Sequence, residues 1–149
     1  MKLCCGASRN SDDETEDNPQ KPKEKKLHNY KRELIEESWG KFMDYEDENS
    51  LNVFIILLQR KTNYMVPYGV EGIPYDEIAD DILIQLHASK LSSFINLYVE
   101  SMDDKEREKE IMTKMNDYVR FVRVPATVLK DYKECTITYM YDNGMMPRE

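Results

Sequence analysis

His87, in the stretch LHASKLSS at residues 86–93, is the imidazole that a folded domain of this chain would have available for chemistry. The other histidine, His28, lies in a very polar N-terminal stretch. The sequence contains no glycine-rich phosphate loop, no CxxC or HExxH motif and no Ser/His/Asp arrangement. Its carboxylates fall on surfaces expected to face solvent. We therefore expect a binding protein, not an enzyme, and take His87 as the side chain to explain.

Cysteine offers a second kind of chemistry, because Cys4 and Cys5 are adjacent near the N-terminus. Such a pair is a candidate for S-acylation, and two acyl chains would hold the protein at a membrane surface. The basic run KPKEKK would add attraction to anionic lipid, whereas N-myristoylation is excluded because residue 2 is Lys2. The alternative is that both are ordinary thiols. With Cys135 the three cysteines lack disulfide or metal-ligand spacing, which favours an intracellular, cytoplasmic setting.

Composition limits the partners and the number of domains. The 149 residues suffice for one ordinary domain. A net charge of −8 and a pI near 4.9 leave no surplus of Lys and Arg to neutralise phosphates, so nucleic acid is not an expected partner. No apolar run reaches the roughly 18 residues of a membrane span, and the first residues lack the apolar core of a secretory signal.

The chain divides by composition into a polar head and a helical body. Residues 1–28 have almost no large apolar side chains, so we expect this segment to be disordered and to carry the S-acylated cysteines. Residues 29–149 are expected to form a single domain. Apolar residues recur there every three or four positions, as in amphipathic helices, and no strand pattern is found. The fold class predicted from the sequence is all-α.

Breaks in this pattern predict the helix boundaries. After a first helix, Asn49 or Ser50 is a suitable cap for a second one. The longest helix is expected from Asp76 to Met102, because neither Gly nor Pro interrupts it. A further helix begins in DDKEREKE, and the last runs from Pro125 to a stop at Asn143-Gly144. The inner face of the longest helix is expected to hold Ile82, Leu83, Leu86 and His87 together.

Four stretches, in this order, resemble the globin family: ESWGKF, NVFIILL, NYMVPY and LHASKLSSFINLYVESMDD. The resemblance covers about residues 30–144, and its last stretch is the most specific. Globins carry in the corresponding helix a distal histidine, then an aliphatic haem contact, and a similar ending. The resemblance implies a globin-like helical fold built around a haem pocket.

The same resemblance assigns roles to individual residues. His87 matches the distal histidine, and Leu91 matches the aliphatic residue that touches the haem one turn later. Phe54 would lie on the distal side, on the second helix. Tyr68 takes the position at which globins keep a phenylalanine against the porphyrin. The implied ligands are haem and a small gas such as oxygen.

Two features depart from the globin pattern. Pro125 matches a proline that follows the proximal histidine by seven residues, so Tyr118 stands in place of that iron ligand. The implied metal-binding pair is then His87 and Tyr118. A phenolate favours ferric iron, which points to redox or gas sensing and signalling instead of oxygen transport. Globins also continue with another long helix, so the resemblance predicts that one face of the core is left open here. Either the sequence is a truncated product, or a protein partner or the membrane covers this face, or the fold has repacked.

Four interpretations remain open from the sequence. The chain binds haem between His87 and Tyr118 and acts as a sensor. Alternatively, it is a globin-like interaction module without haem, tethered to a membrane, in which both residues belong to the core. The third interpretation is a misassembled or partial gene product that does neither. The fourth is an unrelated helical adaptor that is recruited by its lipidated head.

Overall fold

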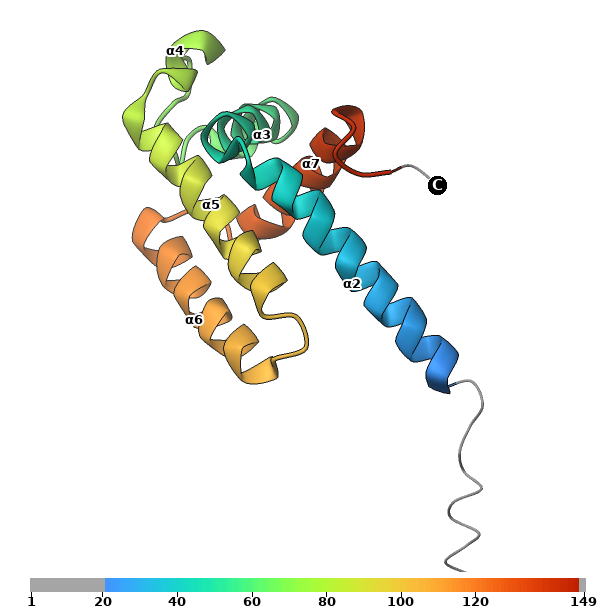
Figure 1. Ribbon diagram of the computed structural model, residues 1–149. Helices are drawn as coiled ribbons and strands as arrows, with labels where there is room; N and C mark the ends of the chain where they lie inside the picture. The colour runs from blue at the N-terminus through green and yellow to red at the C-terminus, as the bar shows by residue number, and fades with distance from the viewer. Residues whose placement is uncertain (1–20, 148–149) are drawn as a thin grey trace, which may run out of the picture. The chain divides into compact units, whose positions relative to one another are not determined.

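The computed structural model describes residues 21–147, with side chains from residue 27 onward. In this range it contains six α-helices and no strand, which confirms the predicted all-α class (Figure 1). The helices are α2 (Lys21–Met43), α3 (Glu46–Arg60), α4 (Tyr75–Ala79), α5 (Ile82–Glu100), α6 (Lys105–Val122) and α7 (Val128–Asp142), with a 3-10 turn η1 (Thr62–Tyr64) after α3.

The described residues fall into two units, a first unit that ends at Ile35 and a second unit that begins at Glu36. In the first unit, α2 begins at Lys21, earlier than the expected start at residue 29. Pro22 falls in the first turn, where its missing N–H is not needed, and the Lys and Glu residues around it are good helix formers. Residues 1–20, including Cys4 and Cys5, lie outside the described residues.

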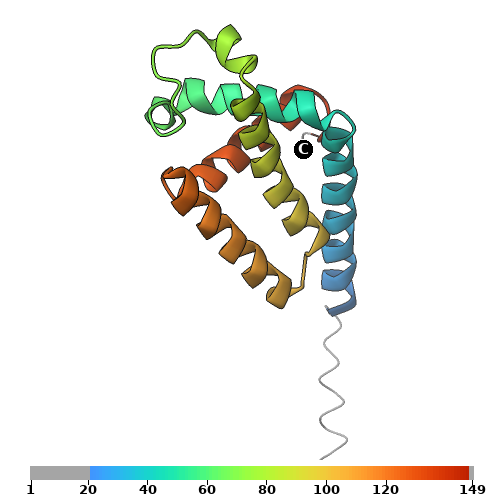
Figure 2. The ribbon, with the colours of Figure 1, turned by 90° about the vertical axis from the view of Figure 1, so that its left-hand side faces the viewer.

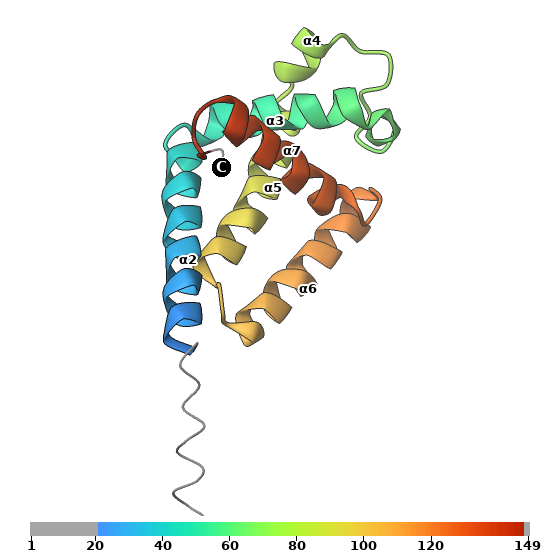
Figure 3. The ribbon, with the colours of Figure 1, turned by 90° about the vertical axis from the view of Figure 1, so that its right-hand side faces the viewer.

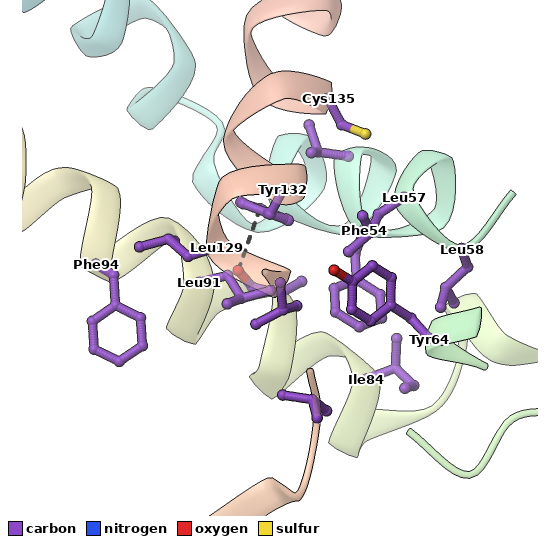
Figure 4. Packing of buried hydrophobic residues seen from close by; sticks show 14 of the residues in the cluster. Phe54, Leu57, Leu58, Tyr64, Ile84, Leu91, Phe94, Leu129, Tyr132 and Cys135 are labelled. Atoms are coloured by element: carbon purple, nitrogen blue, oxygen red, sulfur yellow. Dashed lines mark hydrogen bonds between the residues drawn. The ribbon is translucent and has the colours of Figure 1, made fainter. Parts of the chain in front are cut away.

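The core of the second unit lies where α3, α5 and α7 meet. Figures 2 and 3 show α3 crossing the N-terminal half of α5, with α7 beside both helices. Phe54 and Leu57 of α3, Leu91 and Phe94 of α5 and Tyr132 of α7 have almost no exposed surface, and all five are labelled in the close view of Figure 4. This junction of three helices fixes the position of α5, which carries His87.

Helix α6 runs antiparallel to α5 and lies beside it in all three ribbon views (Figures 1–3). The short connection after α5 ends at Asp104, whose carboxylate accepts a hydrogen bond from the Arg107 N–H at 3.1 Å and caps α6. At its other end α6 stops at Arg123, which adopts a left-handed conformation with φ of 64°. The hairpin brings the C-terminal half of α6 next to the N-terminal half of α5.

The expected cap of the second helix is wrong. Helix α3 begins at Glu46, so Asn49 and Ser50 lie inside it and both are buried. The Asn49 amide donates to the Phe42 carbonyl at 2.8 Å, and the Ser50 hydroxyl shares a 2.7 Å hydrogen bond with that of Ser92. These polar residues face partners in the core instead of ending the helix.

The expected single helix from Asp76 to Met102 is also wrong, because α4 ends at Ala79 and α5 begins at Ile82. Asp81 caps α5, its carboxylate accepting a hydrogen bond from the Leu83 N–H at 2.8 Å. An Asp side chain that bonds the backbone two residues ahead competes with helix continuation, so a break is possible without Gly or Pro.

Candidate functional site

The five residues that the resemblance singles out lie close together in the second unit. Phe54 comes from α3, Tyr68 from the loop after η1, His87 and Leu91 from α5, and Tyr118 from α6. Phe54 and Leu91 are fully buried, Tyr118 is 8% exposed, and Tyr68 and His87 are partly buried. Four segments distant in sequence therefore meet around His87.

Aromatic rings line up edge to face from α3 to α6. The ring centroids of Phe54 and Tyr68 are 4.9 Å apart, as are those of Tyr68 and His87. The ring centroids of His87 and Tyr118 are 5.9 Å apart, and those of Tyr118 and Phe94 of α5 are 5.7 Å apart. Edge-to-face pairs at these distances are favourable beyond the apolar area that they bury.

The loop that carries Tyr68 is held in place by its neighbour Tyr64. The Tyr64 side chain is buried, and its hydroxyl donates to the Asp131 carboxylate of α7 at 2.6 Å. The same hydroxyl lies 2.8 Å from the Thr127 hydroxyl. The Tyr68 N–H donates to the Tyr64 carbonyl at 3.2 Å. The contacts of Tyr64 with α7 therefore help to fix the position of Tyr68.

Hydrogen bonds join the three polar groups of the site. The hydroxyl oxygens of Tyr68 and Tyr118 are 2.8 Å apart, and the Tyr118 oxygen is 3.1 Å from Nδ1 of His87. Helix α6 is thereby bonded directly to α5 and to the loop after η1. We name these three side chains the Tyr68–Tyr118–His87 cluster.

The protonation states of the cluster follow from its burial. Burial lowers the pKa of His87 below its usual value of 6.5, although the Asp81 charge opposes the shift, so the imidazole is neutral at pH 7 and its Nδ1 can accept a proton. Burial raises the pKa of Tyr118 to about 12, against a smaller opposing effect of its hydrogen bond from Tyr68. Burial and the neighbouring Tyr118 raise the pKa of Tyr68 further. The consistent arrangement has Tyr68 donating to Tyr118 and Tyr118 donating to His87.

A haem group does not fit between His87 and Tyr118 in this arrangement. An iron held by both would keep the nitrogen and the oxygen about 4 Å apart, at about 2 Å per bond. The porphyrin ring would also have to pass between the two side chains. Instead the two atoms are 3.1 Å apart and bonded to each other. The five residues are gathered as the resemblance implies, but the space required by the cofactor is filled by their direct contact.

Other kinds of metal site are not indicated by the described side chains. No group of three or more His, Cys, Asp or Glu residues that could hold a metal ion occurs among them. Cys135, which was not assigned a role, is a buried thiol on α7, and burial raises its pKa. The predicted acylation sites Cys4 and Cys5 lie outside the described residues.

The surface of α5 differs from the sequence prediction. Ile82, Leu83 and Leu86 are 68%, 65% and 60% exposed, so the expectation that they share the inner face with His87 is wrong. The inner face is formed by Ile84, Ala88, Leu91, Ser92 and Phe94. At 100° per residue, the exposed leucines and isoleucine project well away from Ile84 and Ala88, and this angular difference was the signal available in the sequence.

Comparisons with known proteins identify no relative of this chain: no family model, no curated protein and no solved structure matches it. Among the described helices none is both long and apolar enough to cross a membrane.

Proposed function

We propose that this chain is a helical interaction module that works without haem and binds a protein partner. The observation that supports this proposal is the 3.1 Å hydrogen bond between His87 Nδ1 and the Tyr118 hydroxyl. In a haem protein these groups would be directed at the cofactor or at its ligand. Here each one satisfies the other, which is the behaviour of polar side chains that hold a core together.

The partner surface that we propose is the exposed side of α5 around Ile82, Leu83 and Leu86. Single exposed apolar residues are ordinary, but three within five residues of one helix form a continuous apolar strip. Four exposed carboxylates precede or border the strip, at Asp76, Glu77, Asp80 and Asp81. A matching partner therefore presents an apolar patch with a basic rim, because such charges steer association and exclude acidic competitors.

Haem titration of the purified full chain tests the first part of this proposal. We expect no Soret band that survives gel filtration, and a folded helical protein by circular dichroism in the same sample. The informative variant is Tyr118→Phe, which removes the phenol oxygen and keeps the ring. A Soret band that remains after gel filtration and shifts in Tyr118→Phe would overturn the haem-free proposal.

Haem binding with a redox, gas-sensing or signalling role is the second candidate function. The observation in its favour is that Phe54, Tyr68, His87, Leu91 and Tyr118 converge from separate segments. His87 and Tyr118 would be the metal ligands, while Phe54, Tyr68 and Leu91 would contact the ring. The cofactor would supply an iron able to bind oxygen or another small gas. This function requires the His87–Tyr118 hydrogen bond to open.

We also propose that the module is tethered to a membrane by S-acylation of Cys4 and Cys5. The support is their adjacency in the sequence and the marginal membrane affinity of a single acyl chain. We expect the chain expressed in cells to sediment with membranes and to be released by hydroxylamine, which cleaves thioesters. The Cys4→Ser/Cys5→Ser variant should sediment with membranes less than the unaltered chain, and hydroxylamine should not change its distribution. Sedimentation of this variant to the same extent as the unaltered chain, or no release of the unaltered chain by hydroxylamine, would refute the tether.

A further inference from the structure

The first unit contains a basic stretch in an otherwise acidic chain. Residues 21–32 contain six Lys or Arg and one Glu, a net charge of +5. The whole chain carries −8, so the remaining 137 residues carry −13. The basic residues are therefore concentrated in one short segment, and that segment is helical, since it forms the first half of α2.

This half of α2 also presents apolar side chains to solvent. Leu27 is 54% exposed and Tyr30 is 60% exposed. Together with the partly buried Leu34 they follow the i, i+3, i+7 spacing that puts three residues on one side of a helix. Lys31, one turn after Leu27, is exposed and borders this row. We name the segment from Lys21 to Leu34 the basic amphipathic segment.

We propose that the basic amphipathic segment binds the surface of an anionic lipid bilayer. A basic helix with a narrow apolar row suits a membrane interface, where the apolar residues enter the headgroup boundary and the cations meet lipid phosphates and carboxylates. Tyr30 has the amphipathic ring that is favoured at headgroup depth.

The position of Lys31 favours a bilayer over a groove in an acidic protein. Inside a closed groove, the ammonium group next to Leu27 would be buried, which is costly unless a carboxylate meets it there. At a bilayer the same side chain lies along the apolar boundary and extends its charge to the headgroups. A row of only three apolar residues also matches the shallow insertion of an interfacial helix.

This interaction does not depend on the proposed acylation of Cys4 and Cys5. It uses residues of α2 alone, so the unmodified protein should have it. Where acylation takes place, the segment would add an electrostatic and interfacial contribution to the anchoring by the acyl chains. Failure of the partner or the haem proposal would leave this inference unaffected, because both concern the second unit.

Vesicle sedimentation with the full unacylated chain, produced in bacteria, provides the test. We expect binding to vesicles that contain one third phosphatidylserine in phosphatidylcholine and little binding to pure phosphatidylcholine. The test variant is Lys25→Gln/Lys26→Gln/Lys31→Gln. Its matched control is Lys114→Gln/Lys130→Gln/Lys133→Gln, which changes three exposed helical lysines of the second unit by the same charge. Gln and Lys have similar helix propensities, so both variants should keep their helices.

The expected loss for the test variant is roughly 100-fold in partition coefficient, at about fivefold per lysine. The control should bind nearly as well as the unaltered chain, with at most a small loss from the added net negative charge. Leu27→Ser/Tyr30→Ser should weaken binding while leaving its dependence on phosphatidylserine in place. The proposal is overturned if the chain stays off anionic vesicles, if it binds neutral vesicles equally well, or if the control variant loses as much binding as the test variant.

Discussion

At the scale of single residues, the main finding is that His87 and Tyr118 bond each other. A half-buried imidazole normally needs a partner, because an unsatisfied polar group in a core is costly. Tyr118 of α6 supplies this partner, and the Tyr68 hydroxyl forms the second hydrogen bond of the Tyr118 oxygen. The residue that stands in place of the proximal ligand in the globin resemblance therefore has a structural use that needs no metal.

Removing the Tyr118 hydroxyl tests this use. In Tyr118→Phe, Tyr68 and His87 both lose a hydrogen-bond partner, so we expect the free energy of unfolding to fall by about 1–3 kcal/mol. Urea denaturation followed by circular dichroism measures the change. Tyr45→Phe is the control, because the Tyr45 side chain is 70% exposed, and it should leave the urea midpoint unchanged. A midpoint for Tyr118→Phe equal to that of the control would rule out a stabilising cluster.

The pH dependence of stability offers a second residue-level prediction. The pKa of His87 is lowered in the folded protein, so the unfolded chain binds the proton more readily. The stabilisation by neutral His87 is therefore complete above the unfolded value of about 6.5 and is lost as the pH falls below it. We expect the free energy of unfolding to decrease from pH 7 toward pH 5.5 more steeply in the unaltered chain than in His87→Gln. Parallel curves for the two proteins would contradict a neutral imidazole.

The sequence pointed to the residues of the candidate site but not to the contacts between them. The globin resemblance, not helix periodicity, singled out Phe54, Tyr68, His87, Leu91 and Tyr118, and in the structure they lie close together. Whether two of them touch or leave room for a cofactor depends on the separation of α5 and α6. Helix periodicity contains no information about that separation.

At the scale of elements, helix ends were harder to predict than helix interiors. The apolar repeat predicts the central parts of α3, α5, α6 and α7, since burial of one face is what stabilises each of them. The break before α5 was missed because a capping Asp81 replaces the Gly or Pro that usually marks a helix end. Whether an Asp side chain ends a helix depends on the competition between its own hydrogen bonds to the backbone and those of the helix. The spacing of apolar residues does not show which of them is favoured.

The C-terminal end of α6 contains a strained residue. Arg123 has a φ of 64°, a conformation that glycine adopts without steric cost and other residues do not. Arg123→Gly should therefore raise the free energy of unfolding by about 0.5–1 kcal/mol. The matched control is Arg120→Gly inside α6, which removes the same charge from an exposed helical position and should lower it by about 1 kcal/mol. Urea midpoints that shift in the same direction for both variants would exclude strain at Arg123.

At the scale of the second unit, a buried polar group joins the three core helices. The Tyr132 hydroxyl of α7 lies 2.6 Å from the Ser92 hydroxyl of α5, which in turn lies 2.7 Å from the Ser50 hydroxyl of α3. The Tyr132 oxygen also lies 3.4 Å from the Ala88 carbonyl. Burial raises the pKa of Tyr132, so the phenol remains protonated and able to donate. From the sequence Ser50 was expected only as a helix cap, and nothing in the sequence indicated that it meets Ser92 and Tyr132.

Loss of this junction should destabilise the whole second unit. In Tyr132→Phe, Ser92 and Ser50 keep each other but lose their link to α7, and we expect the free energy of unfolding to fall by about 1–3 kcal/mol. Tyr141→Phe on the same helix is the control, because Tyr141 is more exposed. Thermal and urea unfolding should each show one transition at a lower midpoint for Tyr132→Phe. An unchanged midpoint would mean that packing alone holds α7.

The single tryptophan gives the protein an internal optical reporter. Trp39 is 6% exposed, stacks on Phe42 with ring centroids 4.8 Å apart, and donates from Nε1 to the Asn96 side chain of α5 at 2.8 Å. Its fluorescence should therefore be blue-shifted in the native state and move to longer wavelength once water reaches the indole. Asn96→Ala should alter the emission spectrum of the native protein before any denaturant is added. If the unaltered native chain showed the emission spectrum of free tryptophan, the packing of Trp39 would be contradicted. Release of the end of α2 from α5 can thus be followed in the unlabelled protein.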